Sequence, residues 1–241
     1  IFKNFFIYYI IQDLVNNNVF NEDELHDYKE NLALFKNNSI NLSKISLKKS
    51  EHMTQDIDQY KIIFVCAAKH IGLQLAKALG AEVHTTISNE QKEVLAQDLG
   101  ADHVINYSKM SPEQYVAQFT EGMGYDLVFD TVGGTCLDHS FEAAKEYGTV
   151  VSIAARSKHD LTQIHVKSLS LHVVFMLLPI LKNQYREQHG NILNKITELV
   201  ENREIKPLLH AEEFSFEEVG LAHECWESRR STGKISLGNT W

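Results

Sequence analysis

Short apolar runs alternate with amphipathic stretches through the middle of this chain. Five runs fit strands that are buried on both faces of a sheet: residues 61–65, 81–86, 102–106, 125–131 and 149–154. Helical patterns fill the intervals between these runs. Strand, helix and strand at this spacing predict a parallel sheet with right-handed crossovers, so we expect an α/β fold with a doubly wound parallel sheet.

Capping residues mark where several of the helices should begin. Ser88 is followed three residues later by Gln91, which is the spacing of a capping box. Ser111 is followed directly by Pro112, a pairing that favours the first turn of a helix. We therefore expect one helix to be capped by each serine, and a further helix over residues 135–147.

The C-terminal part should add an edge strand, helices and a final strand. Residues 166–185 are mostly apolar, and a strand within 168–176 is expected at the edge of the sheet. Ile192 and Ile196 belong to an amphipathic helix, and Ser215 has the spacing to cap the last helix, with Trp226 on its apolar face.

The first sixty residues differ from the rest and are expected to form a short, mainly helical arm with a linker. The apolar run 5–11 is shorter than the roughly 20 residues that cross a bilayer. A packed amphipathic helix explains it better than a membrane-surface helix, because Lys3 is its only basic neighbour. Residues 37–60 are rich in Asn, Ser and Lys, as linkers are.

Composition narrows the possible partners. The chain has 241 residues, 44% of them hydrophobic, which is enough for a sizeable core. Its formal net charge of -9 argues against a nucleic-acid partner, because such a partner requires a concentrated basic face. We also expect no membrane partner.

Cysteine and histidine spacing indicates neither a disulfide framework nor a metal site. The three cysteines, Cys66, Cys136 and Cys225, lie far apart without a Cys-x-x-Cys motif, so we expect reduced thiols in a cytoplasmic protein. The histidines are scattered over different elements, and none is expected to have a nearby carboxylate at ligand spacing.

Four motifs in order resemble one known family. They are QLAKALGAEV at 74–83, LGADHVINY at 99–107, DLVFDTVGG at 126–134 and GKISL at 233–237. They resemble the cofactor-binding and C-terminal part of medium-chain dehydrogenase/reductases, closest to the zinc-independent quinone oxidoreductase branch. The resemblance implies a Rossmann-type NAD(P)-binding domain at 61–180, followed by the family's C-terminal helices and final strand at 181–241.

The chain departs from the family pattern in two places. Residues 1–60 are too short for the family's GroES-like domain, which forms the substrate side of the cleft. The turn 66–71 reads CAAKHI and lacks the glycines that let a backbone approach pyrophosphate. Lys69 could instead bind the phosphates by its charge, or the turn could bind dinucleotide weakly or not at all.

The end of the second strand indicates which cofactor is preferred. NAD-specific sites commonly carry an acidic residue there, whereas this chain reads TTIS at 85–88. In the resembling family, positions matching Lys92 and Tyr107 contact a 2′-phosphate. Together with Ser88 they predict a site for NADPH rather than NADH.

The remaining cofactor residues follow the fourth and fifth strands. Ligands of doubly wound sheets lie beyond the carboxyl ends of the strands. Thr131, Val132, Gly133 and Ser152 match family positions that border the ribose and nicotinamide. We expect Asp130 to hydrogen-bond its own loop rather than act as a general base, and we assign no catalytic residue.

Together these features predict an NADPH-dependent oxidoreductase that reduces a quinone or a conjugated carbonyl compound as its small-molecule substrate, without a metal. The alternative is a non-catalytic Rossmann remnant that serves as an interaction or structural unit. The resemblance further implies a homodimer formed through the edge strand at 168–176.

Overall fold

The computed structural model describes residues 60–65, 70–228 and 231–239. The expected N-terminal arm, apart from Tyr60, and residues 66–69 of the cofactor turn, which include Lys69, therefore lie outside the described residues. Within these ranges no helix is both long and apolar enough to cross a bilayer.

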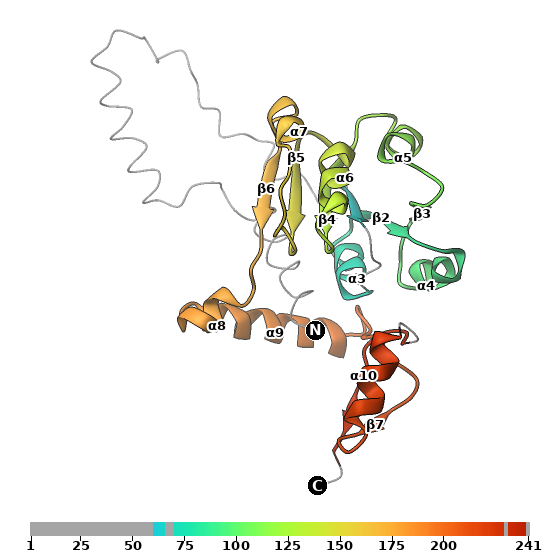
Figure 1. Ribbon diagram of the computed structural model, residues 1–241, viewed down its shortest axis with the longest axis vertical. Coiled ribbons are helices and arrows are strands. Elements are labelled where there is room, and N and C mark those ends of the chain that lie inside the picture. The colour runs from blue at the N-terminus through green and yellow to red at the C-terminus, as the bar shows by residue number, and fades with distance from the viewer. Residues whose placement is uncertain (1–59, 66–69, 229–230, 240–241) are drawn as a thin grey trace, which may run out of the picture.

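The centre of the fold is a six-stranded parallel sheet (Figure 1). Its order is β3-β2-β1-β4-β5-β6. The strands are β1 (Lys61–Val65), β2 (Glu82–Ile87), β3 (His103–Asn106), β4 (Tyr125–Asp130), β5 (Ala144–Ser152) and β6 (Ser170–Val173). The doubly wound, Rossmann-type α/β fold is confirmed, and β6 lies at the edge of the sheet, as expected.

The sheet carries a core on each face because alternate side chains of each strand point in opposite directions. Ile62 and Phe64 of β1 join one cluster, which also contains residues of α3 (His70–Ala78) and α9 (Arg186–Glu201). Ile63 and Val65 join the other cluster, with residues of α5 (Pro112–Phe119) and α6 (Thr135–Ala143). This is why β1 is apolar at every position after Lys61.

The remaining elements are short and lie between or beyond these layers. They are η5 (Glu90–Lys92), α4 (Glu93–Asp98), α7 (Thr162–Val166), α8 (Leu178–Lys182), β7 (Phe214–Ser215), α10 (Val219–Glu227) and β8 (Leu237–Gly238). The final strand β8 pairs in parallel with β7 of the same chain. Next to it, Phe214, Ala222 and Cys225 form a small separate core.

Two of the predicted helix starts differ from the structure. The expected cap at Ser111 is confirmed: Ser111 forms a capping box with Gln114, and Pro112 lies in the first turn. The expected cap at Ser88 is wrong, because the helical segment begins after Asn89, whose side chain makes no capping hydrogen bond. Ser215 likewise lies in β7, and Glu218 precedes α10.

The other differences concern the ends and faces of elements. The helix expected over 135–147 ends at Ala143, and β5 begins at Ala144 because Ala144 pairs with Tyr125 beyond a register shift in β4. In α10 the buried residues are Ala222 and Cys225, whereas Trp226, expected on the apolar face, is 66% exposed.

Candidate functional site

The carboxyl ends of the strands meet along one edge of the sheet. In the register of the sheet, Val65 lies opposite Asp130, and Asp130 lies opposite Ser152. Farther along, Ile87 lies opposite Asn106. The residues that follow these strand ends are therefore brought to the same edge, which we call the carboxyl edge.

Asp130 organises the loop that follows β4. Its buried carboxylate accepts hydrogen bonds from the backbone N–H groups of Val132 at 3.0 Å and Gly133 at 2.9 Å. It also accepts one from the Ser152 hydroxyl at 2.6 Å, and that hydroxyl in turn accepts from the Ala154 N–H at 3.2 Å. The expectation that Asp130 holds its own loop is confirmed. The network joins the loops after β4 and β5.

The loop at Gly133 leaves no room for a larger residue. Gly133 has φ +78°, and a Cβ atom at this position would lie 2.1 Å from the carbonyl oxygen of Ala154. The close approach of the two loops therefore requires glycine. Val132, beside it, is 51% exposed at the carboxyl edge.

Thr131 carries a buried polar atom that is left unsatisfied. Its Oγ1 is buried and has no hydrogen-bond partner in the part of the chain that the structure describes. Because burying an unpaired hydroxyl costs about 1–3 kcal/mol, such an atom at a ligand edge suits a polar ligand group. This residue therefore fits a cofactor bound at the end of β4.

Ser88, Lys92 and Tyr107 form a second group at the ends of β2 and β3. The Lys92 ammonium donates to the Ser88 hydroxyl at 3.3 Å. The backbone N–H of Tyr107 donates to the carbonyl of Ile87 at 3.1 Å, and the Ser108 hydroxyl to the carbonyl of Ser88 at 3.5 Å. The three residues are thus side by side, although they come from different loops. No carboxylate occurs at positions 85–88, so the group is basic and polar.

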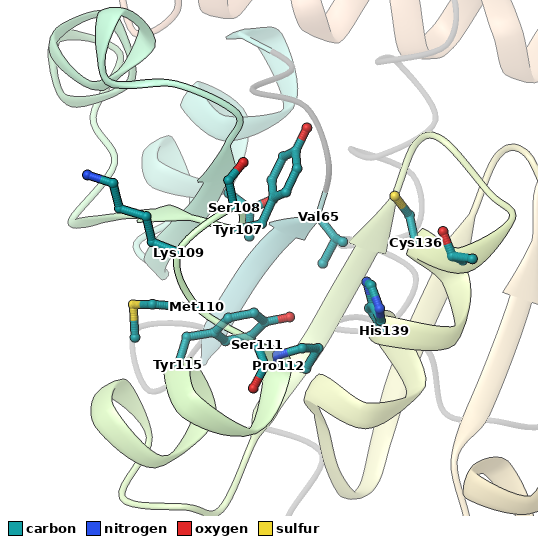
Figure 2. A pocket seen from close by; sticks show the side chains of 12 residues that line it. Val65, Tyr107, Ser108, Lys109, Met110, Ser111, Pro112, Tyr115, Cys136 and His139 are labelled. Carbon is teal, nitrogen blue, oxygen red and sulfur yellow. The ribbon is translucent and has the colours of Figure 1, made fainter.

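A cavity of about 470 Å³ lies beyond the carboxyl ends of β1 and β2. Figure 2 shows Tyr107 and Ser108 on one side of Val65, and Cys136 and His139 of α6 on the other. Thr86, Thr135, residues 109–112 and Tyr115 complete the lining. His139 was not among the predicted site residues, because nothing in its sequence spacing indicates that it lies at this edge.

A second cavity of about 500 Å³ lies beyond β5 and β6. It is lined by residues 153–156, directly after Ser152, and by residues 173–177. The lining is mostly apolar, with Arg156 as its charged residue. The carboxyl edge thus offers two hollows, one on each side of the Asp130 network.

The state of the cysteines differs from the expectation. Cys136, which lines the first cavity, is disulfide-bonded, whereas Cys225 is a free, buried thiol. The three separate reduced thiols predicted from the spacing are therefore not what the structure has.

The sequence of the chain also matches a known protein family, in agreement with the fold described above. A family model described as zinc-binding dehydrogenase matches residues 70–192, just over half of the chain. The chain belongs to this family. The resemblance to the cofactor-binding and C-terminal part of medium-chain dehydrogenase/reductases is thereby confirmed.

The relatives that match this chain are larger proteins. The reducing polyketide synthase FUB1 of Gibberella moniliformis (strain M3125 / FGSC 7600) is 28% identical over 170 residues, which are 68% of this chain and 7% of the synthase. An alcohol dehydrogenase superfamily protein from Novosphingobium aromaticivorans is 33% identical, with a TM-score of 0.69, over 74% of this chain and 55% of that one.

A third match is the quinone oxidoreductase of Escherichia coli, solved in complex with NADPH. It is 26% identical, with a TM-score of 0.65, over 75% of this chain and 57% of that one. The chain thus spans a small part of the synthase and a little over half of each solved structure.

The name of the zinc-binding dehydrogenase family raises the question of a metal at the carboxyl edge. Among the described residues, one group of three possible metal ligands lies close enough together to share an ion. It consists of Glu82, His84 and His103. These residues lie toward the amino ends of β2 and β3, so the described residues of the carboxyl edge form no such group.

This cluster corrects the prediction that no histidine has a carboxylate at ligand spacing. Glu82 and His84 are two residues apart on a strand, so both lie on one face, and that signal was present in the sequence. Burial lowers the pKa of His84, and the hydrogen bond to Glu82 offsets this only in part. His84 is therefore a neutral imidazole at neutral pH.

Proposed function

We propose that this chain is the cofactor-binding part of an oxidoreductase that uses NADPH to reduce a quinone or a conjugated carbonyl compound. The observation that carries this proposal is the group of Ser88, Lys92 and Tyr107 at the end of β2, where positions 85–88 carry no acidic residue. The E. coli quinone oxidoreductase, solved with NADPH, supports it by its similarity.

Each residue has a distinct part in this proposal. The Lys92 ammonium pairs with the 2′-phosphate, and Ser88 and Tyr107 offer hydroxyl groups beside it. The unsatisfied Thr131 hydroxyl and the exposed Val132 border the nicotinamide half, and Asp130 keeps their loop in place through Gly133 and Ser152. The bound cofactor would supply the hydride itself.

Cofactor titration tests the proposal. The Lys92→Ala variant should bind NADPH about tenfold more weakly, because a charge-assisted hydrogen bond is lost, while NADH binding stays nearly unchanged. Lys182→Ala, which removes an exposed lysine from α8, is the matched control and should bind both cofactors as the parent chain does. Equal loss of both cofactors in Lys92→Ala, or no NADPH binding at millimolar concentration, would reject the proposal.

A measurement of NADPH turnover distinguishes the proposed enzyme from a non-catalytic Rossmann unit. The glycine-poor sequence at 66–71 favours a second candidate function, a Rossmann unit that no longer binds dinucleotide. Oxidation of NADPH in the presence of a simple quinone supports the enzyme. Binding without turnover indicates that the substrate side of the cleft must come from elsewhere.

We also propose that two copies pair through β6. This edge strand ends at Val173, which is 59% exposed, and is followed by further exposed apolar side chains such as Phe175 at 54%. Light scattering should give the mass of a dimer, and Val173→Glu should reduce it to that of a monomer. Val94→Glu, at a valine of α4 that is 64% exposed, should leave the dimer intact.

A further inference from the structure

The amino ends of β2 and β3 bring three ligand-type side chains together. Glu82 and His84 lie on the same face of β2, and His103 at the start of β3 lies opposite His84 in the register of the sheet. One potential ligand atom from each residue lies within 4.8 Å of the others. The rings of His84 and His103 have centroids 4.6 Å apart. The group therefore has the size of a single ion site.

We propose that Glu82, His84 and His103 bind a divalent transition-metal ion, with Zn²⁺ the expected ion. Imidazole nitrogen and carboxylate oxygen are the donors that zinc takes in proteins, at about 2.0–2.2 Å. Donors at that distance from one tetrahedral ion are about 3.3 Å apart. Nε2 of His84 and Oε1 of Glu82 are already 2.9 Å apart.

The surroundings of His84 suit a metal ligand. Nδ1 of its buried ring lies 2.9 Å from the hydroxyl oxygen of Tyr125, which is itself fully buried. With an ion on Nε2, Nδ1–H would donate to that hydroxyl, as the second ring nitrogen of a metal ligand usually does. Phe119 packs against both rings, with centroids 5.6 Å from His84 and 5.0 Å from His103. This apolar contact restricts how the rings can turn.

The outer side of the cluster is open to a further ligand. His84 has no exposed surface, but the Glu82 side chain is 36% exposed and His103 is exposed. Three protein ligands with an accessible fourth position leave room for water on the ion. Bridging β2 and β3, the ion would also stabilise this corner of the sheet.

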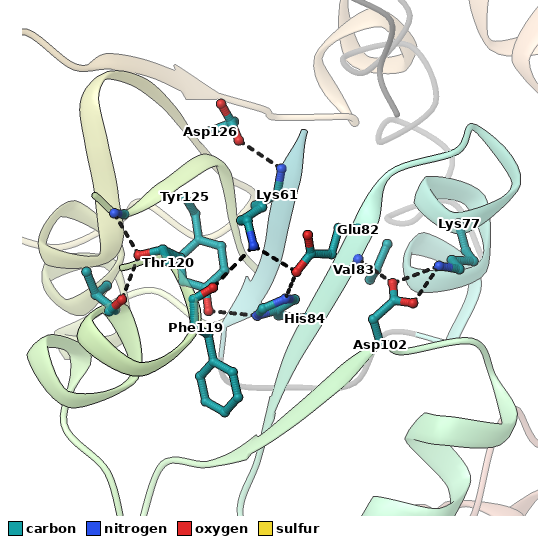
Figure 3. Close-up of polar contacts among 12 residues, drawn as sticks. Lys61, Lys77, Glu82, Val83, His84, Asp102, Phe119, Thr120, Tyr125 and Asp126 are labelled. Carbon is teal, nitrogen blue, oxygen red and sulfur yellow. Dashed lines mark hydrogen bonds and ion pairs between the residues drawn. The ribbon is translucent and has the colours of Figure 1, made fainter. Parts of the chain in front are cut away.

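Lys61 competes with the ion for Glu82. Its ammonium lies 3.0 Å from Oε1 of Glu82 and also donates to the carbonyl of Phe119 at 3.3 Å (Figure 3). A positive charge this close to the site opposes cation binding. Removal of the Lys61 charge should therefore strengthen zinc binding, whereas a purely structural ion-pair network would gain no metal affinity from it.

Calorimetric titration of the full, untagged chain with Zn²⁺ tests the proposal without any cofactor, so it is independent of the proposed oxidoreductase function. Glu82→Gln and His103→Ala should each weaken zinc binding at least tenfold. Lys61→Met should tighten it by a factor of about three or more. His172→Ala, at an exposed histidine of β6, is the matched control and should bind zinc as the parent chain does.

Cobalt absorption and circular dichroism test the geometry of the site and the folding of the variants. Cobalt in place of zinc should give visible absorption bands of a tetrahedral site, and Glu82→Gln should lose them. If His103→Ala does not fold by circular dichroism, His103→Asn replaces it. No zinc binding at submillimolar Zn²⁺, or equal affinities in Glu82→Gln, His103→Ala and His172→Ala, would overturn the proposal.

Discussion

The two edges of the same parallel sheet use their polar residues in opposite ways. At the carboxyl edge, the Asp130 carboxylate bonds the backbone of its own loop and the hydroxyl of Ser152, and hollows of about 470 and 500 Å³ lie on either side. At the amino edge, the Glu82 carboxylate bonds the side chains of both Lys61 and His84 directly.

This difference is the basis for the different ligands proposed at the two edges. At the carboxyl edge, a buried carboxylate fixes the loops by hydrogen bonds. The space outside these loops stays open, which suits an extended ligand such as a dinucleotide. The side chains of the amino edge instead converge on one small region, and a region of this size suits a single ion. The rigidity of the carboxyl edge therefore depends on buried hydrogen bonds and close packing, and that of the amino edge on partly exposed ion pairs.

The largest expected effect is at the carboxyl edge, in Gly133→Ala. The new Cβ would collide with the carbonyl oxygen of Ala154 at a residue with φ +78°. We expect the free energy of unfolding to fall by about 3 kcal/mol, measured by urea denaturation. Gly190→Ala in α9 adds the same methyl group where nothing lies within 4 Å, and it should leave stability unchanged or slightly higher. Equal effects of the two variants would mean that the loop is not closely packed.

A smaller effect is expected from Ser152→Ala. The variant removes the hydroxyl that donates to Asp130 at 2.6 Å inside the buried network. The free energy of unfolding should fall by about 2 kcal/mol, because a buried carboxylate loses one of its donors. Ser108→Ala is the control, since its hydroxyl is exposed and makes one long hydrogen bond of 3.5 Å, and it should change stability by less than about 0.5 kcal/mol. A similar loss in both variants would contradict the role given to the Asp130 network.

The smallest effect should come from the amino edge, in Asp102→Asn. Asp102 pairs with Lys77 at 2.6 Å and accepts from the Val83 N–H at 2.8 Å. Burial alone would raise the pKa of Asp102, but the bonds to Lys77 and Val83 outweigh it, so the pKa is lowered in the folded chain. A lowered folded-state pKa gives stability that is present above the unfolded value, about 3.9, and is lost as the pH falls through the folded value.

Urea denaturation at several pH values measures this contribution. At neutral pH, Asp102→Asn should cost about 1 kcal/mol or less, because the pair is partly exposed and screened by solvent. The difference between the parent chain and the variant should shrink as the pH falls below the unfolded-state pKa of about 3.9. A difference that stayed constant from pH 7 to pH 3 would show that the carboxylate charge is not what stabilises this corner.

The fold was largely predictable because its main elements have strong local signals. The apolar run of β1 is buried on both faces, and the cap at Ser111 is satisfied within one turn. The errors at Ser88 and at Ala144 occurred where tertiary pairing competes with local preference. Ala144 continues the helical pattern in the sequence, but pairing with Tyr125 draws it into β5.

The candidate sites were predictable to different degrees. Ser88, Lys92 and Tyr107 lie together as the family resemblance implied, although their use of NADPH remains a prediction. Lys69 lies outside the described residues, so its role stays a prediction as well. Glu82, His84 and His103 were missed as a group, because His103 is nineteen residues from His84 along the chain and its proximity depends on the β2–β3 register.

The sequence alone determined the parallel α/β architecture and the edge at which ligands should bind. Both follow from hydrophobic periodicity and from the short connections between strands, which are local properties of the chain. Only the tertiary structure decided which side chains from different strands meet: Asp130 with Ser152, and His84 with His103. The physical reason is strand register, which is set by the packing of both sheet faces together and not by any one segment.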